Sequence, residues 1–240
     1  MILTKRSLLA AGLAVVSTRS MAQAWPSKPI RMIVPLAPGA TADIVARVFA
    51  EELGKSLGQT IVVDNKTGAG GTIATAELAR APADGYTMGL VSQGTMVFNI
   101  GLYKTPGYDP LKDLAMVAVT GGVSNVLIVS PDNPARTVAD LLAQARAKPG
   151  ELTYSSGGVG TSHHMSGVLL ELRTGVKLQH VPYRATPAGI QAVANGEVAM
   201  GLFNTPTVIG LIKGGKLKAL AVTSESRSTL LPDAPTMATL

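Results

Sequence analysis

Residues 155–162 read Ser-Ser-Gly-Gly-Val-Gly-Thr-Ser and are the most informative stretch of this chain. They follow a short strand candidate at 152–154 and lead directly into a predicted helix that begins near Thr161. Small residues let backbone N–H groups turn toward a ligand, and the first turn of a helix offers unpaired N–H groups and a positive dipole end. The stretch therefore predicts an anion cradle in an α/β fold. A plain strand-to-helix loop with good N-cap residues is the alternative.

The first 24 residues have the form of an export signal. A Lys-Arg pair at 5–6 precedes a small and apolar run at 7–17, and Ala-Gln-Ala at 22–24 suits signal peptidase. The apolar run is too short to span a bilayer. We expect cleavage after Ala24 and an exported mature chain, with an N-terminal helix of the fold as the alternative. The residues around the Lys-Arg pair resemble a relaxed twin-arginine signal, so Sec and twin-arginine export both stay open.

Composition excludes several classes of protein. The chain of 240 residues has 21 basic and 15 acidic side chains, and removing Lys5, Arg6 and Arg19 with the signal lowers the net charge from +6 to +3. The basic residues are scattered singly, so we expect no nucleic-acid partner. The absence of cysteine excludes a disulfide scaffold, thiol chemistry and cysteine metal sites. The 46% of hydrophobic residues can build a sizeable core in one or two domains.

Apolar β-rich runs alternate with helical patterns along the mature chain, which predicts parallel-rich sheets flanked by helices. In the helix expected at 42–53, an apolar stripe is formed by Ile44, Val45, Val48 and Phe49. Thr137 and Thr186 are expected as N-caps. The expected strands are 30–34, 59–63, 87–92, 126–130, 152–154, 198–203 and 217–223, and the expected helices are 42–53, 72–81, 138–148, 162–174 and 187–195.

Three loops share one chemistry and follow predicted strands. They are 37–41, 67–72 and 155–162, all rich in Gly, Thr and Ser and all leading into predicted helix starts. Ligands of open α/β sheets bind where such loops gather, at the carboxyl ends of the strands. Together the loops predict a small anionic ligand held between two lobes.

Motifs for enzymatic or metal chemistry fail on inspection. The run at 210–216 has P-loop spacing until Leu217, where a Ser or Thr is required, so we interpret it as a helix end closed by glycine. His163 and His164 are adjacent and diverge by about 100° on a helix, so they cannot chelate one ion together. No acid-base pair, nucleophile, dinucleotide motif or metal cluster can be named. We therefore expect no enzyme, no cofactor and no metal.

Six groups of motifs follow one another along the mature chain. They are PLAPG at 35–39, VDNKTGAGG at 63–71, DGYT at 84–87, YDP at 108–110 with KDL at 112–114, HVPYR at 180–184 and GKLKALAVT at 215–223. Together these motifs resemble the Bug family, the periplasmic solute-binding receptors of tripartite tricarboxylate transporters. The resemblance implies a two-lobed type II periplasmic binding protein, or Venus flytrap, that takes a small carboxylate or related solute in its interlobe cleft. It also implies a periplasmic location, membrane permease subunits as partners and a monomer when full length.

The resemblance also implies a layout and a site. Lobe 1 is expected from 25–123 with a return at 225–240, and lobe 2 from 124–224. A periplasmic sensor that feeds a two-component signalling system is the alternative function. Carried onto this sequence, the expected ligand-binding residues are Leu36, Gly39, Thr41, Asp43, Ser92, Thr95, Ser156, Gly160, Thr161, Ser162, His163, Tyr183, Arg184 and Asn204.

The chain also departs from the family pattern. The family usually has glycine where Ala40 stands, a hydroxyl residue at Ala42, Arg-Pro at 66–67 and aspartate at Ala199. The changes at Ala40 and Ala42 narrow the pocket and remove a hydrogen-bond donor, so a ligand need not bind here in the usual dicarboxylate pose. The change at Ala199 removes an acceptor and could alter which ligands are taken. Similar proteins continue well beyond 231–236. We therefore expect lobe 1 to be incomplete at its C-terminal end, with an apolar stripe facing water and poor solubility.

Overall fold

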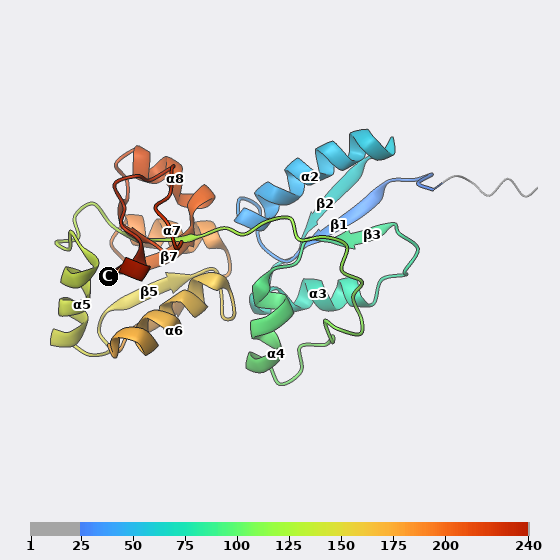
Figure 1. The fold of residues 1–240 in the computed structure, drawn as a ribbon. Helices are drawn as coiled ribbons and strands as arrows, with labels where there is room; N and C mark the ends of the chain where they lie inside the picture. The colour runs from blue at the N-terminus through green and yellow to red at the C-terminus, as the bar shows by residue number, and fades with distance from the viewer. Residues whose placement is uncertain (1–24, 240) are drawn as a thin grey trace, which may run out of the picture.

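A computed structural model describes residues 25–239 and contains two lobes joined by an extended segment (Figure 1). The expected signal peptide lies outside the described residues. Each lobe is built on its own sheet, with three strands in lobe 1 and five in lobe 2. The two-lobed α/β architecture expected from the sequence is confirmed.

Lobe 1 is a parallel sheet of order β2-β1-β3 in which Ile30 pairs with Ile61 and Val34 with Asn65. Its core forms where Ile30, Met32 and Val34 pack beneath the first long helix. The elements are β1 (Ile30–Val34), α2 (Thr41–Leu57), β2 (Ile61–Asn65), η1 (Ala69–Gly71), α3 (Thr72–Ala79), β3 (Thr87–Gly89), η2 (Gly94–Phe98) and α4 (Asn99–Leu102).

Lobe 2 is a mixed sheet of order β6-β5-β7-β4-β8. β5 runs parallel to β6 and β7, whereas β4 runs antiparallel to β7 and β8. The elements are β4 (Asn125–Val129), α5 (Val138–Ala147), β5 (Thr153–Ser156), α6 (Ser162–Thr174), β6 (Gln179–Pro182), α7 (Thr186–Ala194), β7 (Met200–Asn204), α8 (Thr205–Lys213), β8 (Lys218–Val222) and η3 (Met237–Thr239).

The strand β4 is buried on both faces and divides the core of lobe 2 into two layers. Val126 and Ile128 pack toward α7 and α8, while Leu127 and Val129 pack toward α5 and α6. All four side chains are fully buried, as the two-residue period of a strand covered on both sides requires. The antiparallel direction of β4 was not expected. This direction places Asn125, the first residue of β4, at the end of the sheet where β5 and β7 finish.

Helix α2 does not bury the apolar stripe that the sequence shows. Of that stripe, Ile44, Val48 and Phe49 are exposed. Ala46 and Ala50 face the sheet instead and are buried. Small side chains let the helix backbone approach the strands closely, so the alanines occupy the inner face and the bulky residues point outward.

The segment after β8 packs on lobe 2, which corrects the expected return to lobe 1 at 225–240. Leu231 and Ala234 are buried in the layer beside α7 and α8. The backbone N–H of Val222 donates to the carbonyl of Pro235 over 2.9 Å, and Val222 forms a parallel bridge with Thr236. The apolar side chains of this segment find a ready surface beside β8 and bury there.

Two of the predicted helix ends are confirmed and one is wrong. Thr137 caps α5 in a reciprocal capping box with Asp140, and α8 ends at Lys213 with Gly214 as its C-cap. Thr186, however, is the first helical residue of α7, and Ala185 occupies the N-cap position. The Thr186 side chain is buried, and its hydroxyl has no hydrogen-bond partner among the described residues.

Thr137→Ala should destabilise lobe 2 by about 1 kcal/mol, because it leaves a backbone N–H at the start of α5 without its acceptor. Urea unfolding of the mature chain would measure the loss. Thr137→Ser keeps the hydroxyl and is the matched control, with stability near that of the wild type. Equal stability of the alanine and serine variants would show that the cap contributes nothing.

Candidate functional site

The starts of four helices meet between the lobes. Helix α2 of lobe 1 points its N-terminal end toward lobe 2 (Figure 1), and the starts of α6, α7 and α8 face it. The Thr41 hydroxyl donates to Oδ1 of Asn204 over 3.0 Å, which joins the start of α2 to the start of α8. A Cβ on Gly39 would lie 3.7 Å from Cγ of Pro187 in α7. Polar loop ends of both lobes are thus in direct contact.

Asn204 is the centre of this junction. Its Oδ1 accepts from Thr41 and lies 3.2 Å from Nε2 of His163, and its Nδ2 donates to Oδ1 of Asn125 over 2.6 Å. Asn125 in turn donates to the hydroxyl of Ser166 over 2.9 Å. We call Thr41, Asn125, His163 and Asn204 the Asn204 junction. The oxygen and the nitrogen of both side-chain amides, Asn125 and Asn204, are hydrogen-bonded, which fixes the orientation of each amide.

The hydrogen bonds of His163 define its protonation state. Its Nδ1 accepts from the backbone N–H of Gly157 over 3.3 Å, so its Nε2 carries the proton that is shared with Asn204. The ring is buried at 2% exposure. Burial lowers the pKa of His163 to about 4, against the partial opposing effect of Asn204. His163 is therefore a neutral donor at neutral pH.

The glycine loop before α6 is held largely by its own hydrogen bonds. The Ser156 hydroxyl accepts from the N–H of Gly158 over 3.0 Å and lies 2.6 Å from Nε2 of His180. The Thr161 hydroxyl donates to the carbonyl of Gly158 over 2.7 Å and receives the N–H of His164 as the cap of α6. The loop matches the predicted strand-to-helix position. The hydroxyls of Ser156 and Thr161 shape the loop, and their contact with a ligand stays a prediction.

Unpaired donors remain at the helix starts. The first N–H groups of a helix have no intrahelical acceptor. The N-cap residues of α2, α7 and α8 are Ala40, Ala185 and Asn204, and none of the three provides a side-chain cap within the described residues. Pro187 and Pro206 remove one N–H each from α7 and α8, and the N–H of Thr205 in α8 already donates to the carbonyl of Ser124 over 3.1 Å. Helix α2 therefore offers the fullest set. Together these helix starts form a surface suited to an anion.

Asp43 supports the loop before α2 and is electrostatically compensated. Its Oδ2 accepts from the N–H of Gly39 over 2.9 Å, and its Oδ1 lies 2.9 Å from Nη2 of Arg47. Burial works to raise the pKa of Asp43, but the bonds from Arg47 and Gly39 outweigh it and hold the pKa below its usual range. The carboxylate therefore positions Gly39 while Arg47 balances its charge.

The remaining predicted residues have mixed positions. Thr95 and Ser92 bond each other at the start of η2, where the Thr95 hydroxyl accepts from the N–H of Ser92 over 3.2 Å. The carbonyl of Leu36 accepts from Asn65 over 3.0 Å. Tyr183 is half-buried beside the glycine loop, and Arg184 is exposed. These residues lie in loops at the facing sides of the lobes, and their contact with a ligand stays a prediction.

Sequence reasoning missed Asn125. An asparagine directly before a run of apolar strand residues is a recognisable signal, but a residue at the start of a parallel strand would lie far from the site. Only the antiparallel direction of β4 places Asn125 opposite Asn204.

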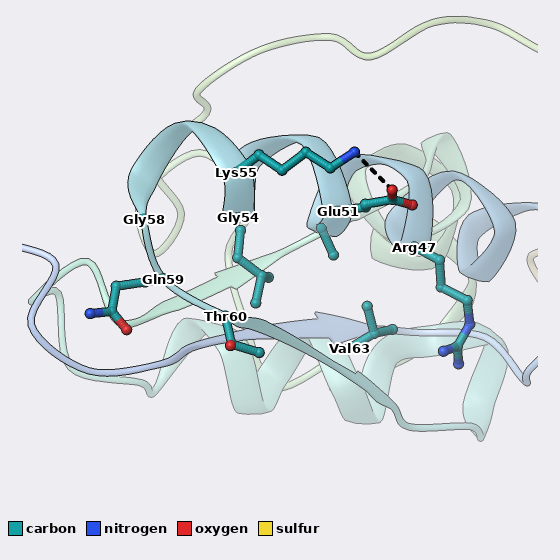
Figure 2. A pocket seen from close by; sticks show the side chains of 10 residues that line it. Arg47, Glu51, Gly54, Lys55, Gly58, Gln59, Thr60 and Val63 are labelled. Atoms are coloured by element: carbon teal, nitrogen blue, oxygen red, sulfur yellow. Dashed lines mark hydrogen bonds and ion pairs between the residues drawn. The ribbon is translucent and has the colours of Figure 1, made fainter.

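Two hollows of the described residues lie away from the helix starts. A groove of about 680 Å³ runs between α2 and the edge strand β2 (Figure 2), and Lys55 bridges to Glu51 over 2.8 Å along its rim. A second, of about 880 Å³, lies in lobe 2 near Arg136 and Leu231. No predicted site residue lines either one. Across residues 25–239, no cluster of acidic or histidine side chains is arranged to hold a metal ion, and no helix combines the length and apolar character needed to cross a bilayer.

The histidines predict a loss of stability in mild acid. Burial lowers the pKa of both His163 and His180 to about 4, whereas an unfolded histidine titrates near 6.5. Between these values the unfolded chain binds more protons than the folded chain. The contribution of these histidines to the free energy of unfolding is therefore fully present above a pH of about 6.5 and is lost as the pH drops toward about 4. Urea midpoints across this range would measure the fall. His180→Gln should make it shallower, and an unchanged slope would contradict the assignment.

Comparisons with known proteins bear on this geometry. The profile of the family described as "Tripartite tricarboxylate transporter family receptor" matches residues 45–240. Protein BugT of Bordetella pertussis is 40% identical over 91% of this chain and 68% of its own length. The structure of R. palustris Rpa4515 with adipate has a TM-score of 0.87 at 37% identity, covering 90% of this chain and 72% of that one.

A more distant structure agrees with these. MatC of Rhodopseudomonas palustris with bound malate has a TM-score of 0.85 at 28% identity, covering 90% of this chain and 73% of that one. The match to the family profile extends over more than half of the chain and includes the starts of α6, α7 and α8. The chain therefore belongs to the tripartite tricarboxylate transporter receptor family, as its motifs predicted.

Proposed function

We propose that this protein is a periplasmic receptor that captures a small carboxylate between its lobes and delivers it to the membrane subunits of a tripartite transporter. The observation that carries the proposal is the meeting of four helix starts from two lobes around Asn204. Relatives in the same family have been crystallised with adipate and with malate. Both are dicarboxylates, which suits a surface of backbone and hydroxyl donors.

The chemistry of the site favours recognition by neutral donors. Asp43 already balances Arg47, and His163 is neutral, so neither supplies a net positive charge. Helix N-termini stabilise an anion through oriented N–H groups, each charge-assisted bond contributing roughly 1.5 to 3 kcal/mol. Arg184 lies exposed in the loop before α7. We assign it to the rim of the site, where it meets the second charge of a ligand.

No catalytic step is proposed. Ser156 and His180 approach as a nucleophile and base would, with 2.6 Å between Oγ and Nε2. The Ser156 side chain is fully buried, however, and its Oγ is also bonded to both backbone groups of Gly158. A substrate cannot reach it without unfolding the loop. We interpret this pair as a support for the glycine loop in a family of binding receptors.

The proposal predicts stabilisation of the mature chain by small carboxylates. Adipate and malate should raise the melting temperature, because a ligand at about 100 times its dissociation constant adds about 2.7 kcal/mol to the free energy of unfolding. The diol and diamide of adipate are matched controls that lack the charge and should have no effect. A screen in which no mono-, di- or tricarboxylate shifts the melting curve would contradict the proposal.

Thr161→Ala should weaken carboxylate binding about tenfold or more. The hydroxyl caps α6 and ties down Gly158, so its loss frees the glycine loop that we propose as part of the site. Isothermal titration with the carboxylate found in the screen would measure the change. Thr161→Ser keeps both hydrogen bonds and should bind like the wild type. An alanine variant with wild-type affinity would remove Thr161 from the site.

A further inference from the structure

Three glycines bring the backbones of the two lobes into contact, apart from the Asn204 junction. A Cβ on Gly70 would lie 2.1 Å from the carbonyl oxygen of Val159, and a Cβ on Gly94 would lie 2.6 Å from that of Gly160. A Cβ on Gly160 would lie 1.8 Å from Oδ1 of Asn99. Real Cβ atoms essentially never approach closer than 3.0 Å. The lobes reach this separation only because these three positions lack side chains.

Two lobe 1 side chains complete this contact. Tyr103 donates its hydroxyl to the carbonyl of Val159 over 3.3 Å, which is a direct bond between the lobes. Asn99 is fully buried and donates to the carbonyl of Gly70 over 2.9 Å, which fixes the approach of η1 to α4. Burial raises the pKa of Tyr103, so its hydroxyl keeps the proton that it donates. We call Gly70, Gly94, Tyr103, Val159 and Gly160 the closure seam.

The closure seam is suited to a reversible contact. It joins two lobes that each have their own apolar core, and it uses backbone groups instead of interlocking side chains. Gly160 belongs to the loop that we assign to the ligand, and Gly70 lies in the predicted ligand loop at 67–72, whereas Gly94 is not among the predicted ligand-binding residues. The seam therefore links the ligand loop to the position of lobe 1.

We propose that the closure seam sets the closed arrangement of the lobes and that Gly94 is a positioning residue for ligand capture. This inference rests on the proposed function, because closure matters only if a ligand is enclosed. A side chain at position 94 would meet a backbone carbonyl of lobe 2, which cannot move aside like a flexible side chain. The lobes would then stop short of closure, and the helix starts around Asn204 would face the ligand from too far apart.

Gly94→Ala is the sharpest test because its own backbone tolerates alanine. Gly70 and Gly160 have positive φ angles of 59° and 82°, so substituting them would add backbone strain. Gly94 is not among the glycines with positive φ. Gly101 lies in the adjoining helix α4, where a Cβ would meet nothing within 4 Å. Gly101→Ala is therefore the matched control, with the same chemical change in a neighbouring helical turn.

The lobe separation can be measured without a ligand. The chain has no cysteine, so Lys55→Cys in α2 and Arg173→Cys in α6 place one spin label on each lobe at exposed positions. Pulsed dipolar spectroscopy should show longer distances in Gly94→Ala than in the wild type, and unchanged distances in Gly101→Ala. A Gly94→Ala distribution that matches the wild type would overturn the proposal.

A second measurement uses adipate as the probe. Adipate affinity should fall roughly tenfold to a hundredfold in Gly94→Ala, which is the range that overpacking costs of about 1–3 kcal/mol imply, and stay unchanged in Gly101→Ala. Unchanged affinity in Gly94→Ala would also overturn the proposal. If the wild-type protein binds no carboxylate, the proposed function fails. The distances between the spin labels then still test whether the closure seam sets the separation of the lobes.

Tyr103→Phe keeps the seam testable if Gly94→Ala does not fold. It removes one oxygen atom and the bond to Val159 and adds nothing to the contact. We expect longer distances between the labels, by less than in Gly94→Ala. Tyr103→Phe with the wild-type distance distribution would show that the seam does not hold the lobes together.

Discussion

The amide of Asn204 is the interaction on which the interlobe structure depends. It accepts from Thr41 of lobe 1 and donates to Asn125 of lobe 2, and it shares the proton of a neutral His163. Leaving one such buried group unpaired costs about 1–3 kcal/mol. The junction therefore fixes the starts of α6 and α8 and ties the start of α2 to them through Thr41, while apolar packing inside each lobe supplies the stability.

The direction of β4 makes the junction possible. The chain enters lobe 2 from the connecting segment, and β4 runs antiparallel to β7, so Asn125 pairs with Asn204 in the sheet register. The register between β4 and β7 is regular over Asn125–Val129, whereas that between β4 and β8 shifts between Leu127 and Ile128. The pairing of β4 with β7 in the core of lobe 2 thus places Asn125 beside Asn204, where the polar contact with lobe 1 forms.

The sequence was a good guide to features with local causes. The capping box at Thr137, the glycine end of α8 and the glycine loop between β5 and α6 all follow from residues a few positions apart. Features with distant causes were missed or wrong. The short edge strand β6 depends on pairing with β5, the burial of Ala46 in place of Val48 depends on how closely α2 approaches the sheet, and the tail at Leu231 depends on an apolar surface beside β8. The hydrogen bond of the Thr161 hydroxyl to Gly158 was not foreseen, and the contact of Thr161 with a ligand stays a prediction.

The central claim is that backbone N–H groups at the helix starts around Asn204 hold a carboxylate. Amide hydrogen exchange with and without adipate reports on these groups directly. The account predicts increased protection at residues 41–43 at the start of α2 and at 162–163 at the start of α6, with little change along the groove between α2 and β2. Protection confined to that groove, or no change at the helix starts under saturating adipate, would contradict it.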